Sequence, residues 1–449
     1  MDNLQDLNEI VGGKLLRGDM KTCINGISTD SRNIKKNDLF IPLVGKTFDG
    51  HKFIGKAVKN GASASLSSIK NIQVENAAII YVKDTLKAFH QIAKSLRQGF
   101  KIPVIGITGS SGKTTTKDML ASILSCAGKT LKTEENYNNE IGVPQTLLQL
   151  NRKHKFAVIE MAMQGLGEIE TLADIARPNV AVITNIGSAH MEHLRSDENI
   201  AKAKSEILAF QTSKDFSVLP ADDKYYGYLK KKTKGKVVFF GINNKADVSA
   251  VDIKFQKDRS IFTIETEKYT LKIDLPLPGK HNIYDALAAA AAAVALKIDP
   301  AIIKKGLESF KLSSKRLNII HSRQLTIIDD TYNANPDSMA ASLNILENYP
   351  PFRIAVLGDM LELGNISIES HKKIGKLAAN LNIEALVTVG KLSKAIAKSA
   401  KESGLQNVHM AKTNREASKI IKRISPQNST ILIKGSRGMH MEEICKKLQ

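Results

Sequence analysis

A short segment, residues 104–125, contains the residue types that bind a nucleotide triphosphate. Its β-branched start predicts a buried strand, and the leucines and isoleucine of its second half recur at helical spacing. Between them, backbone N–H groups at a helix N-terminus can face phosphates, a lysine can neutralise the outer phosphates and a threonine hydroxyl can coordinate Mg²⁺. We therefore predict that ATP phosphates are bound by the residues of this loop, namely Gly109, Ser110, Ser111, Gly112, Lys113, Thr114 and Thr115.

The spacing of this loop differs from that of the common phosphate-binding motif. That motif has a glycine five positions before the one that precedes the lysine, and Ile107 occupies that position here. Gly109 serves instead, which gives the compact pattern Thr-Gly-x-x-Gly-Lys-Thr. An ordinary glycine turn that caps a helix is the alternative interpretation. The predicted strand before the loop and the predicted helix after it favour phosphate binding.

Polar side chains also follow two other predicted strands, at the point where each strand ends. Glu160 comes directly after residues 156–159, while Asn185 and then His190 follow residues 180–183. Ligands of parallel α/β sheets bind outside the carboxyl ends of the strands, so we expect these side chains near the phosphate loop. Glu160 stands where a metal-organising carboxylate is expected. A lone histidine such as His190 is more often structural than a metal ligand, and that alternative stays open.

The elements that must position these residues indicate an α/β protein. A chain of 449 residues is too long for one core and suggests about three domains. We predict a small N-terminal α/β domain over residues 1–100 and a central P-loop-type ATPase domain with a mostly parallel sheet over 101–312. Residues 313–449 are predicted to form a Rossmann-like, doubly wound domain, because four short apolar runs there each stop on polar or glycine residues.

The C-terminal segment lacks a Gly-x-Gly-x-x-Gly loop, which argues against a bound dinucleotide. We interpret this segment instead as a domain that faces the central domain across a cleft. Asp329 and Asp330 follow its first predicted strand and are candidates for ligand binding. They could instead cap the next helix.

The net charge and the cysteines restrict the classes of partner and compartment. The formal net charge is +20, but the lysines are spread through every segment, which fits a polyanionic small substrate or a lysine-rich composition as well as nucleic acid. The three cysteines are too far apart for a disulfide framework or a zinc site, which favours a reducing cytoplasm. The N-terminus does not resemble a signal peptide, and the longest apolar run, residues 286–296, is too short to span a bilayer.

Two local clusters allow more than one interpretation. Arg32, beside Asp30 and Ser31, is a suitable partner for an anion, although a solvated turn has the same composition. Three tyrosines at 225–228 adjoin three lysines at 230–232 on a predicted loop. Such a cluster could stack on nucleic acid, but a solvated surface is the more common explanation.

The chain resembles the Mur ligase family over nearly its whole length. The resemblance rests on residues 30–32, 49–51, 108–114, 136–144, 281–282, 329–336, 358–364 and 434–437. The motifs Tyr-Asn-Ala-Asn-Pro (332–336) and Gly-Asp-Met-Leu-Glu-Leu-Gly (358–364) are similar to those of the member that adds D-alanyl-D-alanine. The resemblance implies an ATP-dependent amide ligase that joins D-alanyl-D-alanine to UDP-N-acetylmuramoyl-tripeptide through an acyl phosphate.

The resemblance also implies roles for individual residues. The residues implied to be catalytic are Lys113, Glu160, His190, Lys204 and Arg316. Those implied to bind the rest of ATP are Asn282 at the adenine, Arg316 at the transferred phosphate and Asp330 at the ribose. Two Mg²⁺ ions would be held by Thr114, Glu160, His190 and Lys204, the last of them carbamylated in this family. The residues implied to bind the UDP-linked substrate are Asp30, Ser31, Arg32, Asn138 and Asn139.

Alternatives remain at this stage. Lys204 on a helix is by default a solvated lysine. Lys202 is the nearest other lysine that could be the carbamylated metal ligand. A sister ligase that adds the third peptide residue, or a folylpolyglutamate-type ligase, would use the same central fold. A nucleic-acid-stimulated P-loop ATPase is a weaker alternative, since no groove-reading motif is present. We expect a cytoplasmic monomer with small-molecule substrates, no nucleic-acid partner and no membrane span.

Overall fold

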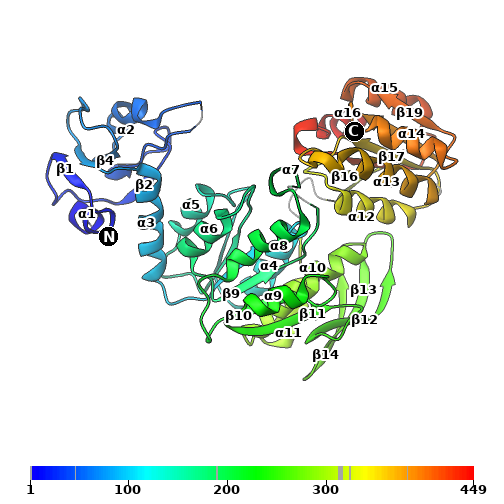
Figure 1. Ribbon diagram of the computed structural model, residues 1–449, viewed down its shortest axis with the longest axis horizontal. Coiled ribbons are helices and arrows are strands. Elements are labelled where there is room, and N and C mark those ends of the chain that lie inside the picture. Colours follow the sequence, from blue (N-terminus) through cyan, green and yellow to red (C-terminus); the bar gives the residue numbers. More distant parts are fainter. Residues whose placement is uncertain (1–2, 46, 189–190, 312–316, 323–324, 382) are drawn as a thin grey trace.

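The computed structural model describes residues 3–45, 47–188, 191–311, 317–322, 325–381 and 383–449. They form three sheets, one after another along the chain (Figure 1). In Figure 1 the large central sheet lies between the N-terminal sheet and the C-terminal sheet, which occupy opposite ends of the molecule. Each sheet is mainly parallel and carries helices, which confirms the predicted α/β class. The domain limits proposed from the sequence stay predictions.

The N-terminal sheet has the strand order β1-β5-β4-β3-β2, with β1 antiparallel to β5 and the remaining pairs parallel. Its last helix, α3, runs beside helices α5 (Gly142–Leu147) and α6 (Glu168–Ala176) of the central domain (Figure 1). Lys94 of α3 forms an ion pair of 2.8 Å with Asp174, and the buried Arg97 donates to the carbonyl of Ala176. The elements are α1 (Leu4–Val11), β1 (Lys14–Arg17), β2 (Gly26–Ser28), β3 (Asp38–Phe40), α2 (Ile54–Lys59), β4 (Ala64–Ser67), β5 (Ala78–Tyr81) and α3 (Thr85–Gln98).

The central sheet has the order β14-β13-β12-β11-β10-β9-β6-β8-β7. From β7 to β12 the neighbours are parallel, and β13 and β14 add an antiparallel edge. Its strands are β6 (Val104–Thr108), β7 (Thr130–Lys132), β8 (Phe156–Glu160), β9 (Val180–Ile183), β10 (Phe216–Pro220), β11 (Lys236–Gly241), β12 (Val248–Phe255), β13 (Ser260–Thr266) and β14 (Thr270–Leu275). Its helices are α4 (Lys113–Ala127), α5 (Gly142–Leu147), α6 (Glu168–Ala176), α7 (Met191–Leu194), α8 (Asp197–Ser205), α9 (Tyr226–Lys232), α10 (Lys280–Ala295) and α11 (Pro300–Glu308).

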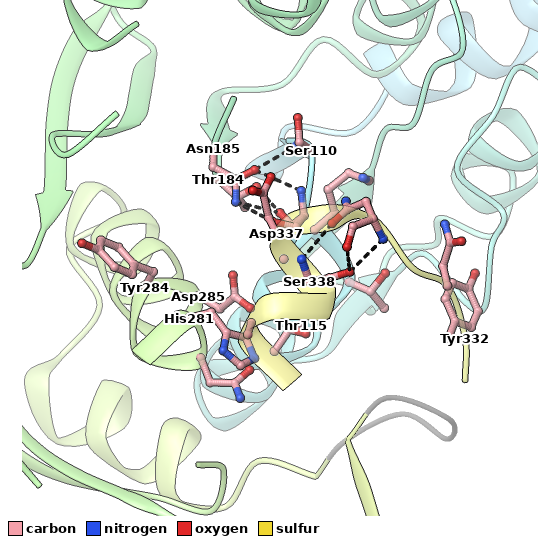
Figure 2. A pocket seen from close by; sticks show the side chains of 18 of the residues that line it. Ser110, Thr115, Thr184, Asn185, His281, Tyr284, Asp285, Tyr332, Asp337 and Ser338 are labelled. Carbon is pink, nitrogen blue, oxygen red and sulfur yellow. Dashed lines mark hydrogen bonds between the residues drawn. The ribbon is translucent and has the colours of Figure 1, made fainter. Parts of the chain in front are cut away.

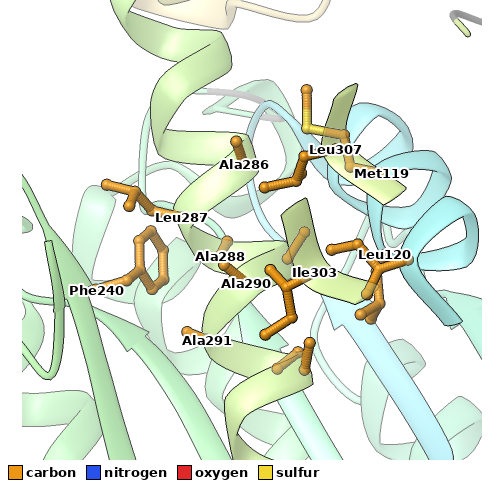
Figure 3. Packing of buried hydrophobic residues seen from close by; sticks show 14 of the residues in the cluster. Met119, Leu120, Phe240, Ala286, Leu287, Ala288, Ala290, Ala291, Ile303 and Leu307 are labelled. Carbon is orange, nitrogen blue, oxygen red and sulfur yellow. The ribbon is translucent and has the colours of Figure 1, made fainter. Parts of the chain in front are cut away.

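The alanine-rich run predicted to pack closely against a sheet forms the buried helix α10. Ala288, Ala290 and Ala291 have almost no exposed surface and lie between Phe240 of the sheet and the neighbouring helices (Figure 3). Small side chains allow this close approach, because each alanine occupies little space between the two backbones. The adjoining pair α4 and α11 is equally tight, since a Cβ on Gly306 would lie 2.3 Å from the Cα of Ile123. This core fixes the start of α4, where the phosphate loop ends.

The tyrosine and lysine cluster was predicted to lie on a loop, and this prediction is wrong: residues 226–232 form helix α9. Its side chains contact protein groups instead of forming a free stacking platform. The Lys232 ammonium lies 5.6 Å from the ring centroid of Tyr228, and the Lys230 ammonium lies 5.9 Å from that of Phe239. Cation–π contact and the burial of Leu229 stabilise a helix that the charge run alone does not predict.

The C-terminal sheet has the order β15-β16-β20-β17-β18-β19, with β15 antiparallel at one edge. Alternate residues enter two separate cores, as when Ile431 and Ile433 face α15 and α16 while Leu432 faces α12 and α13. Helices therefore cover both faces, as predicted for a doubly wound sheet. The elements are β15 (Asn318–His321), β16 (Leu325–Asp330), α12 (Pro336–Glu347), β17 (Arg353–Gly358), α13 (Ser367–Asn380), β18 (Ala385–Val389), α14 (Lys394–Glu402), β19 (Val408–Ala411), α15 (Asn414–Ile424), β20 (Ser429–Lys434) and α16 (Glu442–Leu448).

Candidate active site

The loop between β6 and α4 adopts a shape that two glycines make possible. Gly109 and Gly112 have φ angles of +153° and +77°, in the region that side chains disfavour. A Cβ on Gly109 would lie 1.8 Å from Thr184 Oγ1, and one on Gly112 would lie 2.0 Å from Asp285 Oδ1. Neighbouring elements thus approach the loop so closely that only glycine fits, and its backbone amides gather at the start of α4.

Asn185, which follows β9, holds the loop from outside. Its Oδ1 accepts hydrogen bonds from the backbone N–H groups of Ser110 (3.1 Å) and Ser111 (3.0 Å), and its Nδ2 donates to Ser111 Oγ (2.7 Å). Thr184 Oγ1 donates to the carbonyl of Ser111 at 2.6 Å. Sequence reasoning placed polar groups at this strand end but assigned Thr184 and Asn185 no role. Their position after a buried strand was the available signal.

Glu160 joins the phosphate loop to the asparagine-rich segment 136–139 in a single hydrogen-bonded group. At the end of β8 its Oε2 accepts from Thr114 Oγ1 at 2.9 Å and its Oε1 accepts from Asn138 Nδ2 at 2.8 Å. The Glu160 carboxylate is buried. A threonine hydroxyl beside a carboxylate supplies the hard oxygen ligands that Mg²⁺ prefers, so these residues fit the metal that the sequence implies.

Lys113 and Lys204 bring two lysine amino groups to the same part of the site. Lys113 Nζ donates to the carbonyl of Gly109 at 2.8 Å, which folds its side chain back over the loop. Lys204 on α8 is 2% exposed, whereas Lys202 points to solvent. Burial and the nearby charge of Lys113 hold the pKa of Lys204 well below its usual value. The default interpretation of Lys204 as a solvated lysine is therefore wrong.

A cavity of about 690 Å³ lies between the phosphate loop and the C-terminal domain. Figure 2 shows its lining: the loop and the end of β9 on one side, and the first turns of α12 on the other. The predicted site residues that line it are Ser110, Ser111, Gly112, Lys113, Thr114, Thr115, Asn138, Glu160, Asn282 and Asp330. Residues from two domains thus enclose one space large enough for a nucleotide.

Asp330 does not cap the following helix, whose N-cap is Asn335. Asp330 instead pairs with the buried ammonium of Lys434 and accepts a 2.6 Å hydrogen bond from Ser342. Lys434 also donates to the carbonyl of Asn333 at 3.1 Å. Sequence reasoning noted Lys434 at a strand end without assigning it to the site.

His281, at the start of α10, faces this ion pair from the central domain. Burial lowers the pKa of His281 from its usual 6.5 to about 4, with Asp330 opposing the shift and Lys434 adding to it. The imidazole is therefore neutral at physiological pH. The next residue, Asn282, is buried and donates to the carbonyl of Pro278 at 2.7 Å, which leaves its side chain fixed at the wall of the cavity.

Asp222 and Tyr284 form another part of the wall that sequence reasoning missed. Tyr284 donates a 2.6 Å hydrogen bond to Asp222 Oδ2, and burial raises the pKa of Tyr284 strongly, with help from that carboxylate. Asp222 also accepts from the backbone N–H groups of Ile242, Asn243 and Asn244. The carboxylate thereby ties the ends of β10 and β11 to α10.

The residues predicted for the UDP-linked substrate do not all lie at this cavity. Asp30 and Arg32 form a two-point ion pair in the N-terminal domain, with Arg32 largely exposed. Hydrogen bonds from Arg32 hold the pKa of Asp30 below its usual value. Ser31 is buried beside them, and Asn139 accepts from the backbone N–H of Gly142 at the start of α5. Asn138 alone of these predicted residues lines the described cavity.

Two predicted site residues, His190 and Arg316, lie outside the residues that the structure describes. Gly109 contributes its carbonyl to Lys113, although its own atoms do not line the cavity. In the described part of the chain, no group of three or more histidine, cysteine, aspartate or glutamate side chains could hold a metal ion. Over the same residues, no helix combines the length and hydropathy that crossing a bilayer requires.

Three known domains match the chain in order. Residues 23–97 match the catalytic domain of the Mur ligase family, residues 107–293 match the Mur ligase middle domain, and residues 315–437 match the Mur ligase glutamate ligase domain. The three matches fall on the N-terminal, central and C-terminal sheets in turn, with β1 outside the first match and most of β6 outside the second. The fold and the order of domains are therefore those of one protein family.

Relatives are similar over the full length. The chain is 38% identical to UDP-N-acetylmuramoyl-tripeptide–D-alanyl-D-alanine ligase of Bacillus subtilis, covering 99% of this chain and 98% of the relative. It is 37% identical to the Escherichia coli protein of the same name, with the same coverage. The structure of MurF from Acinetobacter baumannii superposes with a TM-score of 0.93 at 35% identity, covering 99% and 98% of the two chains. MurF ligase from Thermotoga maritima, in complex with ADP, superposes with a TM-score of 0.85 at 27% identity over 94% and 96%.

Proposed function

The chain belongs to the Mur ligase family, and we propose that it joins D-alanyl-D-alanine to UDP-N-acetylmuramoyl-tripeptide at the expense of ATP. The product is the UDP-linked pentapeptide precursor of peptidoglycan. The observation that carries this proposal is the similarity to ligases of that name over 99% of the chain. The cavity between the phosphate loop and the C-terminal domain supports it, because both halves of a ligation must meet there.

A free carboxylate is a poor electrophile, so the tripeptide must first be activated. We propose that its terminal carboxylate takes the γ-phosphoryl group of ATP, which gives an acyl phosphate and ADP. The amine of the dipeptide then forms a C–N bond with the acyl carbon and loses a proton to solvent. The C–O bond to phosphate breaks, and inorganic phosphate leaves with the electron pair.

The residues of this chain would contribute charge and position. Lys113 and the loop amides around Gly112 would neutralise and orient the outer phosphates, because phosphoryl transfer depends mainly on such electrostatic stabilisation. Arg316 would act on the transferred phosphate, while Asn282 and Asp330 would bind adenine and ribose. Closure of the two domains would exclude water from the acyl phosphate.

The metal site is part of the proposal. Thr114, Glu160, His190 and Lys204 would hold two Mg²⁺ ions, which supply positive charge to the phosphates when bound. The low pKa of Lys204 favours the neutral amine, the form that reacts with carbon dioxide to give a carbamate. Such a carbamate, formed with loss of one proton, would convert a buried neutral amine into an anionic ligand.

Each domain has a proposed task. Residues 1–100 would bind the uridine end of the substrate through Asp30, Ser31 and Arg32. Residues 101–312 would bind ATP, with Asn138 and Asn139 near the middle of the UDP-linked substrate. Residues 313–449 would bind the incoming dipeptide. We further propose that the protein works as a monomer in the cytoplasm.

One assay tests the function. Purified protein is given ATP, Mg²⁺ and UDP-N-acetylmuramoyl-tripeptide, and phosphate release is followed with a panel of amines. Release that depends on D-alanyl-D-alanine supports the proposal. Release that depends on lysine or diaminopimelate would favour a sister ligase. Release that depends on glutamate would favour a folylpolyglutamate-type ligase. Stimulation by nucleic acid without any amine would favour the ATPase alternative.

A further inference from the structure

Asp337 carries a carboxylate from the C-terminal domain to the edge of the phosphate loop. It lies in the first turn of α12, and a Cβ on Gly187 of the central domain would lie 2.3 Å from its Oδ2. The same point lies 3.4 Å from the Cβ of Ser110. Figure 2 shows Asp337 beside Ser110, Thr184 and Asn185, and its side chain remains exposed to the cavity. A carboxylate therefore faces a site built for the phosphates of ATP.

A carboxylate in the first turn interacts favourably with the dipole of α12, but the capping of this helix does not require Asp337. Asn335 and Ser338 already form a capping box at its start, with the N-cap side chain accepting from Ser338 N at 2.8 Å. The Asp337 carboxylate instead accepts a hydrogen bond from the backbone N–H of Ser188 in the central domain. Loss of water and the charge of Asp197 raise the pKa of Asp337, against the effect of that hydrogen bond. A cation that joins the Asp337 carboxylate would offset the repulsion from Asp197.

The ligation that we propose provides two kinds of cation. Mg²⁺ has candidate ligands on the opposite wall, where Thr114 meets Glu160. The other cation is the ammonium group of D-alanyl-D-alanine, which approaches the acyl phosphate from the C-terminal domain if that domain binds the dipeptide, as proposed above. Asp337 is on that domain and faces the loop that would hold the transferred phosphate.

We propose that Asp337 binds the ammonium group of the incoming dipeptide and positions its nitrogen beside the acyl phosphate, where the ammonium loses one proton to solvent before the free amine attacks. This inference rests on the proposed function and adds a specificity residue to it. Charge-assisted hydrogen bonds from ammonium to carboxylate have the required directionality. A dipeptide analogue without the ammonium group lacks this interaction and relies on the remaining contacts of the cleft.

The test compares the Asp337→Asn variant with wild type and with Glu369→Gln. Glu369 is an exposed acidic residue in the first turn of α13, so its variant removes the same charge from a helix start in the same domain. Three quantities are measured: KM for D-alanyl-D-alanine, formation of acyl phosphate without dipeptide by borohydride trapping, and the inhibition constant of N-propionyl-D-alanine, the dipeptide without its ammonium group.

We expect Asp337→Asn to raise KM for the dipeptide about 10- to 100-fold, the range for a lost charge-assisted hydrogen bond. Acyl-phosphate formation and inhibition by the neutral analogue are expected to stay within about twofold of wild type, and Glu369→Gln is expected to match wild type throughout. An unchanged KM would overturn the inference. So would an equal loss of acyl-phosphate formation or of analogue binding, because Asp337 would then act on ATP, on Mg²⁺ or on cleft shape. Wild-type protein that forms no acyl phosphate would instead refute the proposed function itself.

Discussion

The hydroxyl of Thr114 and the carboxylate of Glu160 lie 2.9 Å apart, although 46 positions separate them in the chain. The contact forms because β6 and β8 are neighbouring parallel strands whose carboxyl ends share one edge of the sheet. Thr114 stands at the start of the helix after β6, and Glu160 is the last residue of β8. The pair places a hydroxyl and a carboxylate at the point where the phosphate loop ends.

Replacing Glu160 by glutamine should weaken the response of the enzyme to magnesium. The amide keeps the shape of the side chain but loses the negative charge that favours a divalent cation. We expect the Mg²⁺ concentration for half-maximal rate to rise about tenfold or more, by the effect of losing one ligand charge. Initial rates over a Mg²⁺ series measure this, with Glu170→Gln, an exposed residue of α6, as the control. An unchanged magnesium dependence would refute a metal role for Glu160.

Lys113→Ala should abolish measurable ligation while the protein stays folded. Loss of one preorganised charge at a transferring phosphoryl group costs about 10² to 10³ in kcat. Phosphate release with all substrates present gives the rate, and the melting temperature reports the fold. Lys231→Ala on α9 removes an exposed lysine of the same domain and should leave both quantities unchanged. Retained ligation in Lys113→Ala would count heavily against the assignment of the phosphate loop.

Gly112→Ala should damage ATP binding and stability together. The residue has a φ of +77°, and the new Cβ would lie 2.0 Å from Asp285 Oδ1, so either the loop or α10 must move. We expect a loss of about 1–3 kcal/mol in free energy of unfolding. Gly55→Ala is the matched control, because Gly55 lies in helix α2 with nothing within 4 Å of a Cβ. Calorimetry measures the affinity of each variant for ADP, and chemical unfolding measures its free energy of unfolding. Equal values for Gly112→Ala and Gly55→Ala would contradict the steric argument.

Much of the site could be predicted because its residues occur in local patterns. The phosphate loop combines a strand, two glycines and a lysine within a few positions, and Glu160 directly follows a strand of the same sheet. Short apolar runs that end on polar residues, together with helical spacing, gave the α/β class for the same reason. Residues such as Lys113 and Thr114 therefore need no tertiary information to be selected.

Other features depend on contacts between distant segments. The burial of Lys204 arises from the packing of α8. Helix α9 is stabilised by the contact between the rings of Tyr226 and Phe239, and the composition of the segment does not reveal this contact with β11. Asn185 holds the phosphate loop through side-chain hydrogen bonds whose geometry appears only when β6 and β9 pair. Tertiary packing overrides local propensity at such positions.

Acidification should destabilise the protein partly through His281. Its pKa is lowered from 6.5 to about 4, so between these pH values the unfolded chain binds more protons than the folded one. The contribution of His281 to the free energy of unfolding is therefore fully present above pH 6.5 and is lost as the pH falls toward 4. This loss amounts to about 3 kcal/mol at most. The melting temperature of His281→Asn should fall less steeply over this range than that of wild type. His321→Asn, at an exposed site on β15, should show the wild-type slope, and equal slopes for all three proteins would contradict the prediction.

The buried pair of Asp330 and Lys434 should show strong thermodynamic coupling. Asp330→Asn leaves the Lys434 ammonium, which is 3% exposed, without its carboxylate partner. We expect this variant to lose about 3–5 kcal/mol in free energy of unfolding, the cost of an uncompensated buried charge. Lys434→Met removes that charge, so the double variant should be more stable than Asp330→Asn alone by about 1–3 kcal/mol. Denaturant unfolding of the four proteins of the cycle measures the coupling, and strictly additive losses would show that the ion pair contributes nothing specific.

The KM for ATP should rise in Asp330→Asn and stay high in the double variant if Asp330 also binds ribose, because Lys434→Met restores stability but not the carboxylate.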